Sequence, residues 1–198
     1  AVSPTPTTTP PPPPPTVPPT VPPTLTPAMT EAKAHFELGN TYLEQEQWDR
    51  AISEYTQAIE LGSRDYEGLA KAYFGLGYSS FKAGQIDEAL VDFTRAILLD
   101  SNTANYYYYR GEAYYQLAAS YNNTEQDPEK IEGNNKAIED YTEAIELGFE
   151  DAEIYNRRGN CYAANGNYYG ALADYRKALT LAENERTKDQ ILASIKHL

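Results

Sequence analysis

A pattern of glycine, alanine and aromatic residues recurs four times along the chain and restricts its fold more than any other feature. In each copy a glycine follows an aromatic residue or a histidine by four residues, at Gly39, Gly77, Gly111 and Gly159. Each glycine is followed by alanine, an aromatic residue and alanine at intervals of four and three residues: Ala51, Tyr55, Ala58; Ala89, Phe93, Ala96; Ala137, Tyr141, Ala144; Ala171, Tyr175, Ala178. Residues at such intervals share one face of an α-helix. The pattern therefore predicts pairs of amphipathic helices with small residues where they approach each other.

One helix pair of this size has too little apolar surface to fold alone, so neighbouring pairs must stack on one another. Within the second copy, Gly84 interrupts the helical pattern and marks the turn between the two helices. At 198 residues the chain is long enough for one such array with a continuous core. We therefore predict an all-α fold.

This pattern resembles the tetratricopeptide repeat, a helix-turn-helix unit of about 34 residues. The interval from Gly77 to Gly111 matches that period. The resemblance implies a right-handed α-solenoid of about four units within residues 31–185. We place the units at about 32–65, 70–103, 104–151 and 152–185, and a capping helix at 186–198, where Ile191, Leu192 and Ile195 are expected to share one face.

The repeats depart from the family pattern in three ways. The proline that normally ends each repeat is replaced, at Ser63, Ser101, Phe149 and Glu183. The third repeat carries 14 extra residues between Tyr115 and Ala137, whose Asn, Asp, Pro and Gly content predicts a loop. Arg110 and Arg158 replace Leu38 and Leu76 before the glycine, which predicts that this face meets solvent or an acidic group in the later repeats.

A proline- and threonine-rich tail over residues 1–30 precedes the repeats. Residues 1–27 hold 13 of the 14 prolines and no charge, so we expect a polyproline II conformation that reaches roughly 80 Å when extended. Such a tail is either a stiff spacer or a ligand for an aromatic groove. The prolines of the ligand segment would be Pro10, Pro11, Pro12, Pro13, Pro14, Pro15, Pro18, Pro19, Pro22 and Pro23. The candidate O-glycosylation acceptors are Thr5, Thr7, Thr8, Thr9, Thr16, Thr20, Thr24 and Thr26.

Composition excludes several classes of function. The net charge of −13 and the absence of a basic cluster argue against nucleic acid and anionic membranes as partners. No apolar run reaches the roughly 20 residues of a membrane span. Cys161 is the only cysteine, and His35 and His197 lie at opposite ends of the chain. We therefore predict no disulfide, metal, cofactor or catalytic residue, and a chain that is not an enzyme.

The chain begins at Ala1 and combines one cysteine with a body rich in Tyr, Asn and Thr. These features are typical of an exported bacterial protein, so we expect an extracellular or cell-envelope location, while a cytoplasmic one stays open.

In tetratricopeptide repeat proteins the first helix of each repeat lines a concave groove that takes extended peptides. The positions that the resemblance places there are Phe36, Asn40, Leu43, Phe74, Tyr78, Phe81, Tyr108, Glu112, Tyr115, Asn156 and Asn160. The aromatic residues among them are suited to stack on proline rings, although each is equally suited to the core between helices.

Two functions follow from these features. In the first, the tail of one copy docks on the repeats of the next and builds a head-to-tail extracellular filament or other homo-oligomer. In the alternative, an envelope-anchored adaptor binds another protein's peptide in its groove and uses the tail as a spacer.

Overall fold

The computed structural model describes residues 27–61, 66–121 and 127–198, and all regular structure in these ranges is α-helical. The prediction of an all-α fold is confirmed. The tail residues 1–26, with their candidate ligand prolines and threonines, lie outside the described residues. The helices are α1 (Pro27–Glu44), α2 (Trp48–Glu60), α3 (Tyr66–Lys82), α4 (Ile86–Leu99), α5 (Ala104–Ser120), α6 (Pro128–Glu146), α7 (Ala152–Ala164), α8 (Tyr168–Leu181) and α9 (Glu185–Lys196).

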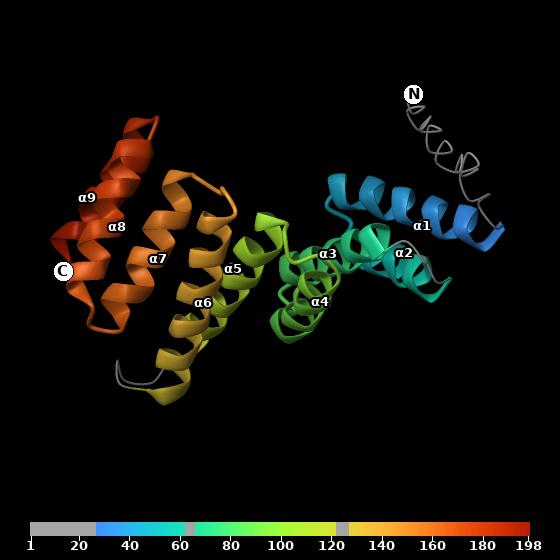
Figure 1. Cartoon of the computed structure of the whole chain (residues 1–198), viewed down its shortest axis with the longest axis horizontal. Helices are drawn as coiled ribbons and strands as arrows, with labels where there is room; N and C mark the ends of the chain where they lie inside the picture. The colour runs from blue at the N-terminus through green and yellow to red at the C-terminus, as the bar shows by residue number, and fades with distance from the viewer. Residues whose placement is uncertain (1–26, 62–65, 122–126) are drawn as a thin grey trace, which may run out of the picture.

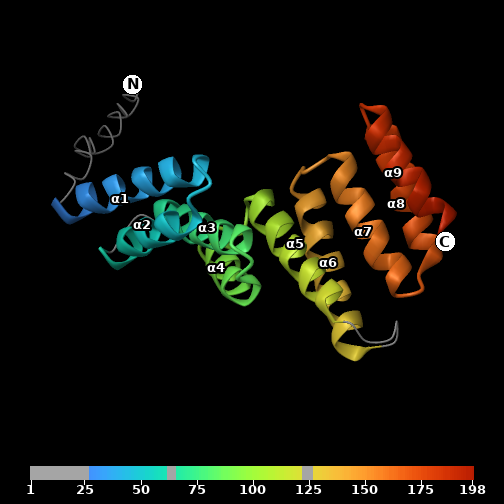
Figure 2. The same cartoon turned by 180° about the vertical axis from the view of Figure 1, so that it is seen from behind.

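The helices stack as a solenoid. Each packs on the one before it. The first helices of adjacent repeats also touch in the pairs α1–α3 and α3–α5, and α7 touches the capping helix α9. The helix pairs α1–α2, α3–α4, α5–α6 and α7–α8, called repeats 1 to 4 below, follow one another along the long axis (Figure 1). Seen from behind, α1 and α9 again lie at opposite ends (Figure 2).

The repeated glycine and aromatic residue form one packing unit. In each repeat the aromatic ring of the second helix, from Tyr55, Phe93, Tyr141 or Tyr175, is almost completely buried. It fills the space left by the absent side chain of the glycine: a Cβ added at Gly159 would lie 2.7 Å from Tyr175. The glycine is therefore required by close approach, and the pattern in the sequence is the pattern of the core.

The turns inside repeats 1, 2 and 4 each contain a residue in the left-handed region. Gly84 in repeat 2 and Gly166 in repeat 4 have φ of 82° and 75°, a region that glycine adopts without strain. In repeat 1 the same region is occupied by Glu46, with φ of 57°. The amide that follows each turn residue donates back to the helix, as from Gln85 to the carbonyl of Ser80 at 2.8 Å.

The insertion in repeat 3 is largely helical, so the prediction of a loop is wrong for its second half. Helix α6 starts at Pro128, whose ring suits the first helical position, and the Asp127 side chain accepts a hydrogen bond from the Glu129 amide at 3.0 Å. Gly133 then lets α6 approach α5, since a Cβ there would lie 3.0 Å from that of Ala118. Residues 122–126 lie outside the described ranges.

The two terminal helices, α1 and α9, bound the described array. Helix α1 begins at Pro27 and includes Thr30. At the other end, Asn184 caps α9 by accepting a hydrogen bond from the Thr187 amide at 2.9 Å. Ile191 of α9 is buried, whereas Leu192 is exposed. A capping helix therefore ends the array, with a narrower apolar face than the sequence predicts.

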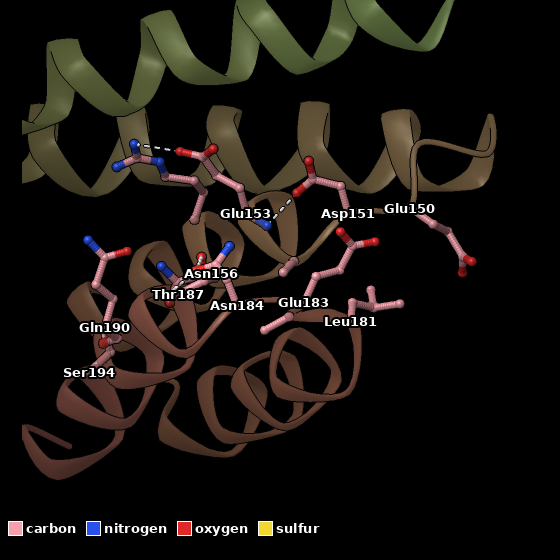
Figure 3. A pocket seen from close by; sticks show the side chains of 13 residues that line it. Glu150, Asp151, Glu153, Asn156, Leu181, Glu183, Asn184, Thr187, Gln190 and Ser194 are labelled. Carbon is pink, nitrogen blue, oxygen red and sulfur yellow. Dashed lines mark hydrogen bonds and ion pairs between the residues drawn. The ribbon is translucent and has the colours of Figure 1, made fainter.

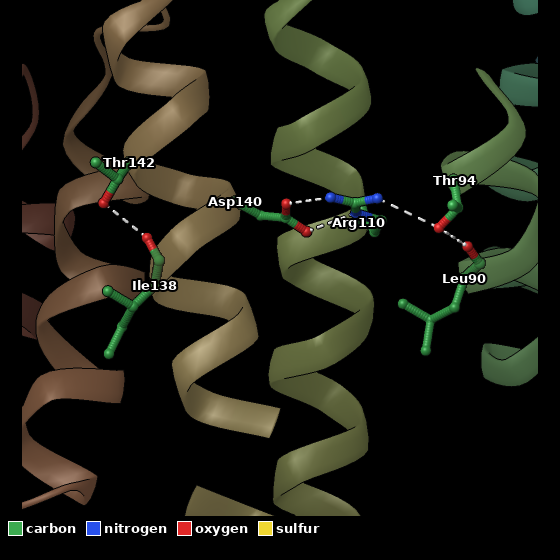
Figure 4. A network of polar contacts seen from close by, with 6 residues as sticks. All are labelled: Leu90, Thr94, Arg110, Ile138, Asp140 and Thr142. Carbon is green, nitrogen blue, oxygen red and sulfur yellow. Dashed lines mark hydrogen bonds and ion pairs between the residues drawn. The ribbon is translucent and has the colours of Figure 1, made fainter. Parts of the chain in front are cut away.

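Arg110 in α5 joins three helices (Figure 4). Its Nε and Nη2 donate to both carboxylate oxygens of Asp140 in α6, at 2.8 and 2.7 Å, and its Nη1 donates to the Thr94 hydroxyl of α4 at 3.3 Å. Arg158 makes the same contacts one repeat later, with Asp174 at 2.8 Å from both nitrogens and with Thr142 at 3.0 Å. Of the two alternatives predicted for this face, solvent or an acidic group, the structure shows the acidic group.

Candidate functional site

The predicted groove positions occupy three places in the first helix of each repeat: three residues before the repeated glycine, one after it and four after it. The structure gives each place a different role. Only some of the eleven predicted residues are free to contact a ligand, and the roles below follow from their packing partners.

The position before the glycine packs over the buried ring of its own repeat. Phe36 lies 5.8 Å from Tyr55, Phe74 lies 5.8 Å from Phe93, and Tyr108 lies 6.2 Å from Tyr141, measured between ring centroids. Phe36 and Phe74 keep part of their surface exposed.

Tyr108 differs from the expectation of a groove residue because it is buried. Phe149, from the turn between α6 and α7, stacks on it at 4.5 Å with an interplanar angle of 13°. Burial and the nearby Glu112 also raise the pKa of Tyr108 well above its usual value.

In repeats 1, 3 and 4 the residue after the glycine accepts a hydrogen bond from the hydroxyl of the buried tyrosine. Asn40 accepts a hydrogen bond from Tyr55 at 2.6 Å, and Asn160 accepts one from Tyr175 at 2.8 Å. Glu112 accepts one from Tyr141 at 2.6 Å and is itself buried. These three predicted groove residues therefore have a structural role. The sequence contained a signal for this role. In the three repeats whose buried ring is a tyrosine, the residue after the glycine has a side-chain oxygen that can accept a hydrogen bond. In repeat 2 the ring is Phe93, which has no hydroxyl, and the residue after the glycine is Tyr78.

An aromatic cluster lies between α3 and α5, and it includes three of the predicted residues. Tyr109, which the sequence did not indicate, contacts Phe74, Tyr78 and Phe81 at ring distances of 5.7, 4.9 and 6.5 Å. Burial, with a further contribution from Tyr78, raises the pKa of Tyr109 to about 12, so its hydroxyl stays protonated at neutral pH. All four rings are half-buried, and the ammonium of Lys82 lies 5.6 Å from the centre of the Tyr78 ring.

An apolar pocket of 310 Å³ lies beside this cluster's helix α3, between α1 and α3. Lys33, Glu67 and Lys71 supply its charged groups, and Lys71 pairs with Glu67 at 2.6 Å. The apolar lining residues are Met29, Ala32, Phe36, Ala58, Leu69 and Ala72. Phe36 is therefore the predicted groove residue with access to this pocket.

A larger cleft of 740 Å³ lies at the other end of the array, between α7 and α9 (Figure 3). Its lining is polar, in contrast to the α1–α3 pocket. The turn before α7 contributes Glu150 and Asp151, and α7 contributes Glu153, Asn156 and Arg157. The other lining residues are Ala152, Leu181, Ala182, Glu183, Asn184, Thr187, Gln190 and Ser194. Of the predicted groove residues, Asn156 alone lines this cleft.

Arg157 connects this cleft to repeat 3. It lies 3.4 Å from Glu112 and 3.0 Å from Glu153, and its guanidinium lies 5.2 Å from the centre of the Tyr115 ring. Burial alone would lower the pKa of Arg157, but the two carboxylates outweigh it and raise the pKa, so the guanidinium stays charged. The ring of Tyr115 therefore contacts the guanidinium of Arg157. The last predicted groove residue, Leu43, is half-buried on α1.

Cys161 is fully buried, and burial raises the pKa of its thiol to about 12. Within the described ranges, no three His, Cys, Asp or Glu side chains converge to hold a metal ion. None of the helices described there is long and apolar enough to cross a bilayer.

Comparison with known families settles the identity of the repeats. The description "Tetratricopeptide repeat" matches residues 32–65 and 152–185, and "TPR repeat" matches residues 77–117. The chain belongs to the tetratricopeptide repeat (TPR) family. No curated protein matches this TPR chain.

Several solved TPR structures resemble it. A crystal structure of MamA has 26% sequence identity and a TM-score of 0.63, covering 80% of this chain and 81% of that one. YrrB, described as a TPR protein with an unusual peptide-binding site, has 20% identity and a TM-score of 0.66, covering 84% and 75%. A thermophilic TPR protein of Thermus thermophilus has 20% identity and a TM-score of 0.62, covering 83% and 80%. The likenesses at 20% identity concern the fold alone. This TPR chain is a protein–protein interaction module.

Proposed function

We propose that this TPR protein is an exported, non-enzymatic assembly module in which the tail of one copy docks on the repeats of a neighbouring copy. The observation that carries the proposal is chemical complementarity within one chain. The tail has no charge and is rich in proline. The α1–α3 pocket has a largely apolar lining, and the aromatic cluster on α3 and α5 offers further half-buried rings for such a segment.

Polyproline segments are ordered before they bind, so an aromatic surface captures them at small entropic cost. The half-buried rings of Phe74, Tyr78 and Phe81 suit contact with proline rings, and the tyrosine hydroxyl suits the carbonyls that a proline-rich strand leaves free. A tail that leaves one end of the solenoid and binds the next copy makes a head-to-tail contact. Such a contact need not close, so it supports a filament.

The alternative adaptor differs in one respect, because its tail binds nothing and its groove binds another protein. Export and O-glycosylation of the tail threonines belong to both versions. Intact-mass measurement of native material tests the glycosylation, and surface labelling of intact cells tests the location.

Deletion of residues 1–26 separates the two versions. We expect the full chain to form assemblies visible by electron microscopy and light scattering, and the deletion variant to be monomeric. A synthetic peptide of residues 1–26 should then bind the deletion variant. Assemblies that persist without the tail, or a full chain that stays monomeric at high concentration, would contradict tail docking.

A pair of matched substitutions locates the docking surface. Leu69→Asp places a charge in the α1–α3 pocket and should abolish binding of the tail peptide, because the peptide offers no cation to pair with it. Leu98→Asp makes the same change at an exposed site on α4 outside the pocket and should leave binding unchanged. Equal affinity of the two variants would remove the pocket from the proposal.

A further inference from the structure

The cleft between α7 and α9 is lined by a position at which repeat 4 lacks the aromatic residue of the other repeats. Where repeats 1 to 3 have Phe36, Phe74 and Tyr108, repeat 4 has Asn156. The smaller, polar Asn156 lines the cleft, which has a volume of 740 Å³.

The amide of Asn156 is an acceptor without a donor. Its Oδ1 has less than 1 Å² of accessible surface, and no hydrogen-bond donor of the described residues reaches it. A buried acceptor left in this state costs about 1–3 kcal/mol relative to a satisfied one. Asn156 lines the cleft and part of its side chain is exposed there, so rotation of the amide would bring Oδ1 within reach of a donor from a bound ligand.

The residues that line the cleft carry more negative than positive charge. Glu150, Asp151, Glu153 and Glu183 line it together with one guanidinium, that of Arg157. The charge of Arg157 is offset by Glu112 at 3.4 Å and Glu153 at 3.0 Å, although its buried Nε has no hydrogen-bond partner among the described residues. The lining therefore carries an excess of negative charge that no lysine or arginine among the lining residues balances.

The four lining carboxylates differ in how far they are already engaged. Asp151 caps α7 by accepting from the amides of Glu153 and Ile154. Glu150 lies 3.6 Å from Lys177. Glu183 is exposed and has no polar partner among the residues that the structure describes. Glu183 is thus the carboxylate with the most freedom to pair with a ligand.

We propose that this cleft binds a basic side chain, lysine or arginine, presented by an extended peptide of a partner protein. Such a group carries both a positive charge for Glu183 and N–H donors for Asn156. A divalent metal ion fits less well, because no three carboxylates of the described residues converge. The tail cannot supply the group, since residues 1–26 contain no lysine or arginine. The cleft is therefore a second site with a different partner from the α1–α3 pocket.

Titration of the full chain with two blocked peptides tests this site. Both have the acetylated and amidated frame Gly-Ser-Gly-Ser-X-Ser-Gly-Ser-Gly, with arginine or glutamine at X. We expect weak binding of the arginine peptide, with Kd on the order of 1 mM, read by ¹⁵N NMR as shifts centred on the Asn156 side-chain amide. Shifts of equal size with the glutamine peptide, or no shifts with several millimolar arginine peptide, would overturn the proposal.

Substitutions separate this site from the tail site. Glu183→Gln should weaken arginine-peptide binding by about threefold, as for one exposed ion pair, whereas Glu60→Gln on α2 makes the same charge change far from the cleft and should have no effect. Asn156→Phe restores the aromatic residue of the other repeats and should abolish binding by filling the cleft. Arginine-peptide binding that survives Asn156→Phe in a folded protein would place the site elsewhere.

The tail-deletion variant distinguishes failure of this proposal from failure of tail docking. It should bind the arginine peptide as the full chain does. Its assembly state and its peptide affinity are therefore independent measurements.

Discussion

The ring of Tyr55, in the first repeat, lies directly against the backbone of Gly75, in the second. A Cβ added at Gly75 would lie 2.5 Å from Tyr55 Cζ, closer than any contact that real Cβ atoms make. The ring cannot move aside easily, because it is buried and its hydroxyl donates to Asn40. The junction between repeats 1 and 2 therefore depends on one glycine.

Gly75→Ala should destabilise the protein although alanine favours helix by about 1 kcal/mol over glycine. Overpacking a fixed core typically costs about 1–3 kcal/mol, so we expect a net loss of about 1 kcal/mol in the free energy of unfolding. Urea denaturation followed by circular dichroism measures it. A variant more stable than the wild type would show that the ring yields.

Glu46→Gly should stabilise the protein. Glu46 occupies the left-handed region, which costs a residue with a side chain roughly 1–2 kcal/mol, and the equivalent turns use Gly84 and Gly166. We expect a gain of about 1 kcal/mol, reduced by the greater freedom of glycine in the unfolded chain. The matched control is Gly84→Glu, which should lose a similar amount. Thermal denaturation of both variants measures the two effects. Stability changes of the same sign in both variants would show that Glu46 is not strained.

Arg110→Leu should cost about 3 kcal/mol, because it leaves the buried carboxylate of Asp140 without its partner. Burial already raises the pKa of Asp140 despite the opposing effect of Arg110. The double variant Arg110→Leu, Asp140→Ala should recover most of that loss. A double variant no more stable than Arg110→Leu would show that the arginine acts through packing and not through its charge.

The Glu112 carboxylate should make stability depend on pH. Burial raises its pKa above the usual 4.5, against the opposing effects of the Tyr141 hydroxyl and Arg157. The folded state therefore binds this proton more tightly than the unfolded state. Its contribution is fully present below about pH 4.5 and is lost as the pH rises through the folded-state pKa.

Glu112→Gln keeps an acceptor for Tyr141 and removes the titration. The free energy of unfolding of the wild type relative to this variant should fall between pH 4 and 7, as measured by urea denaturation at each pH. Asn40 and Asn160 show that a neutral amide fills the same position in repeats 1 and 4. A difference that rises with pH would mean that Arg157 dominates the environment of Glu112.

The helical repeats could be predicted because spacing reports directly on which residues share a helix face. For Arg110 the sequence left two alternatives, solvent or an acidic group, because spacing alone does not show how deeply the position is buried. The groove was harder to predict, because spacing places Asn40 or Glu112 on a face without showing that a tyrosine hydroxyl reaches it. Tyr108 was assigned to the groove for the same reason, as nothing in the spacing shows that Phe149 covers it. The helical insertion was missed because Asp127-Pro128 was read as part of a loop, although it also suits a helix start.

The polar contacts of Arg110 and Arg158 are distributed unevenly, and this has a consequence for how the array opens. Thr94 joins repeat 2 to repeat 3, and Thr142 joins repeat 3 to repeat 4, whereas the leucines in repeats 1 and 2 supply no such tie. Local opening of a solenoid is governed by the strength of each junction. Amide hydrogens of α1 and α2 should therefore exchange with deuterium before those of α5 to α8, and the first helix pair should detach while the rest of the array is still folded.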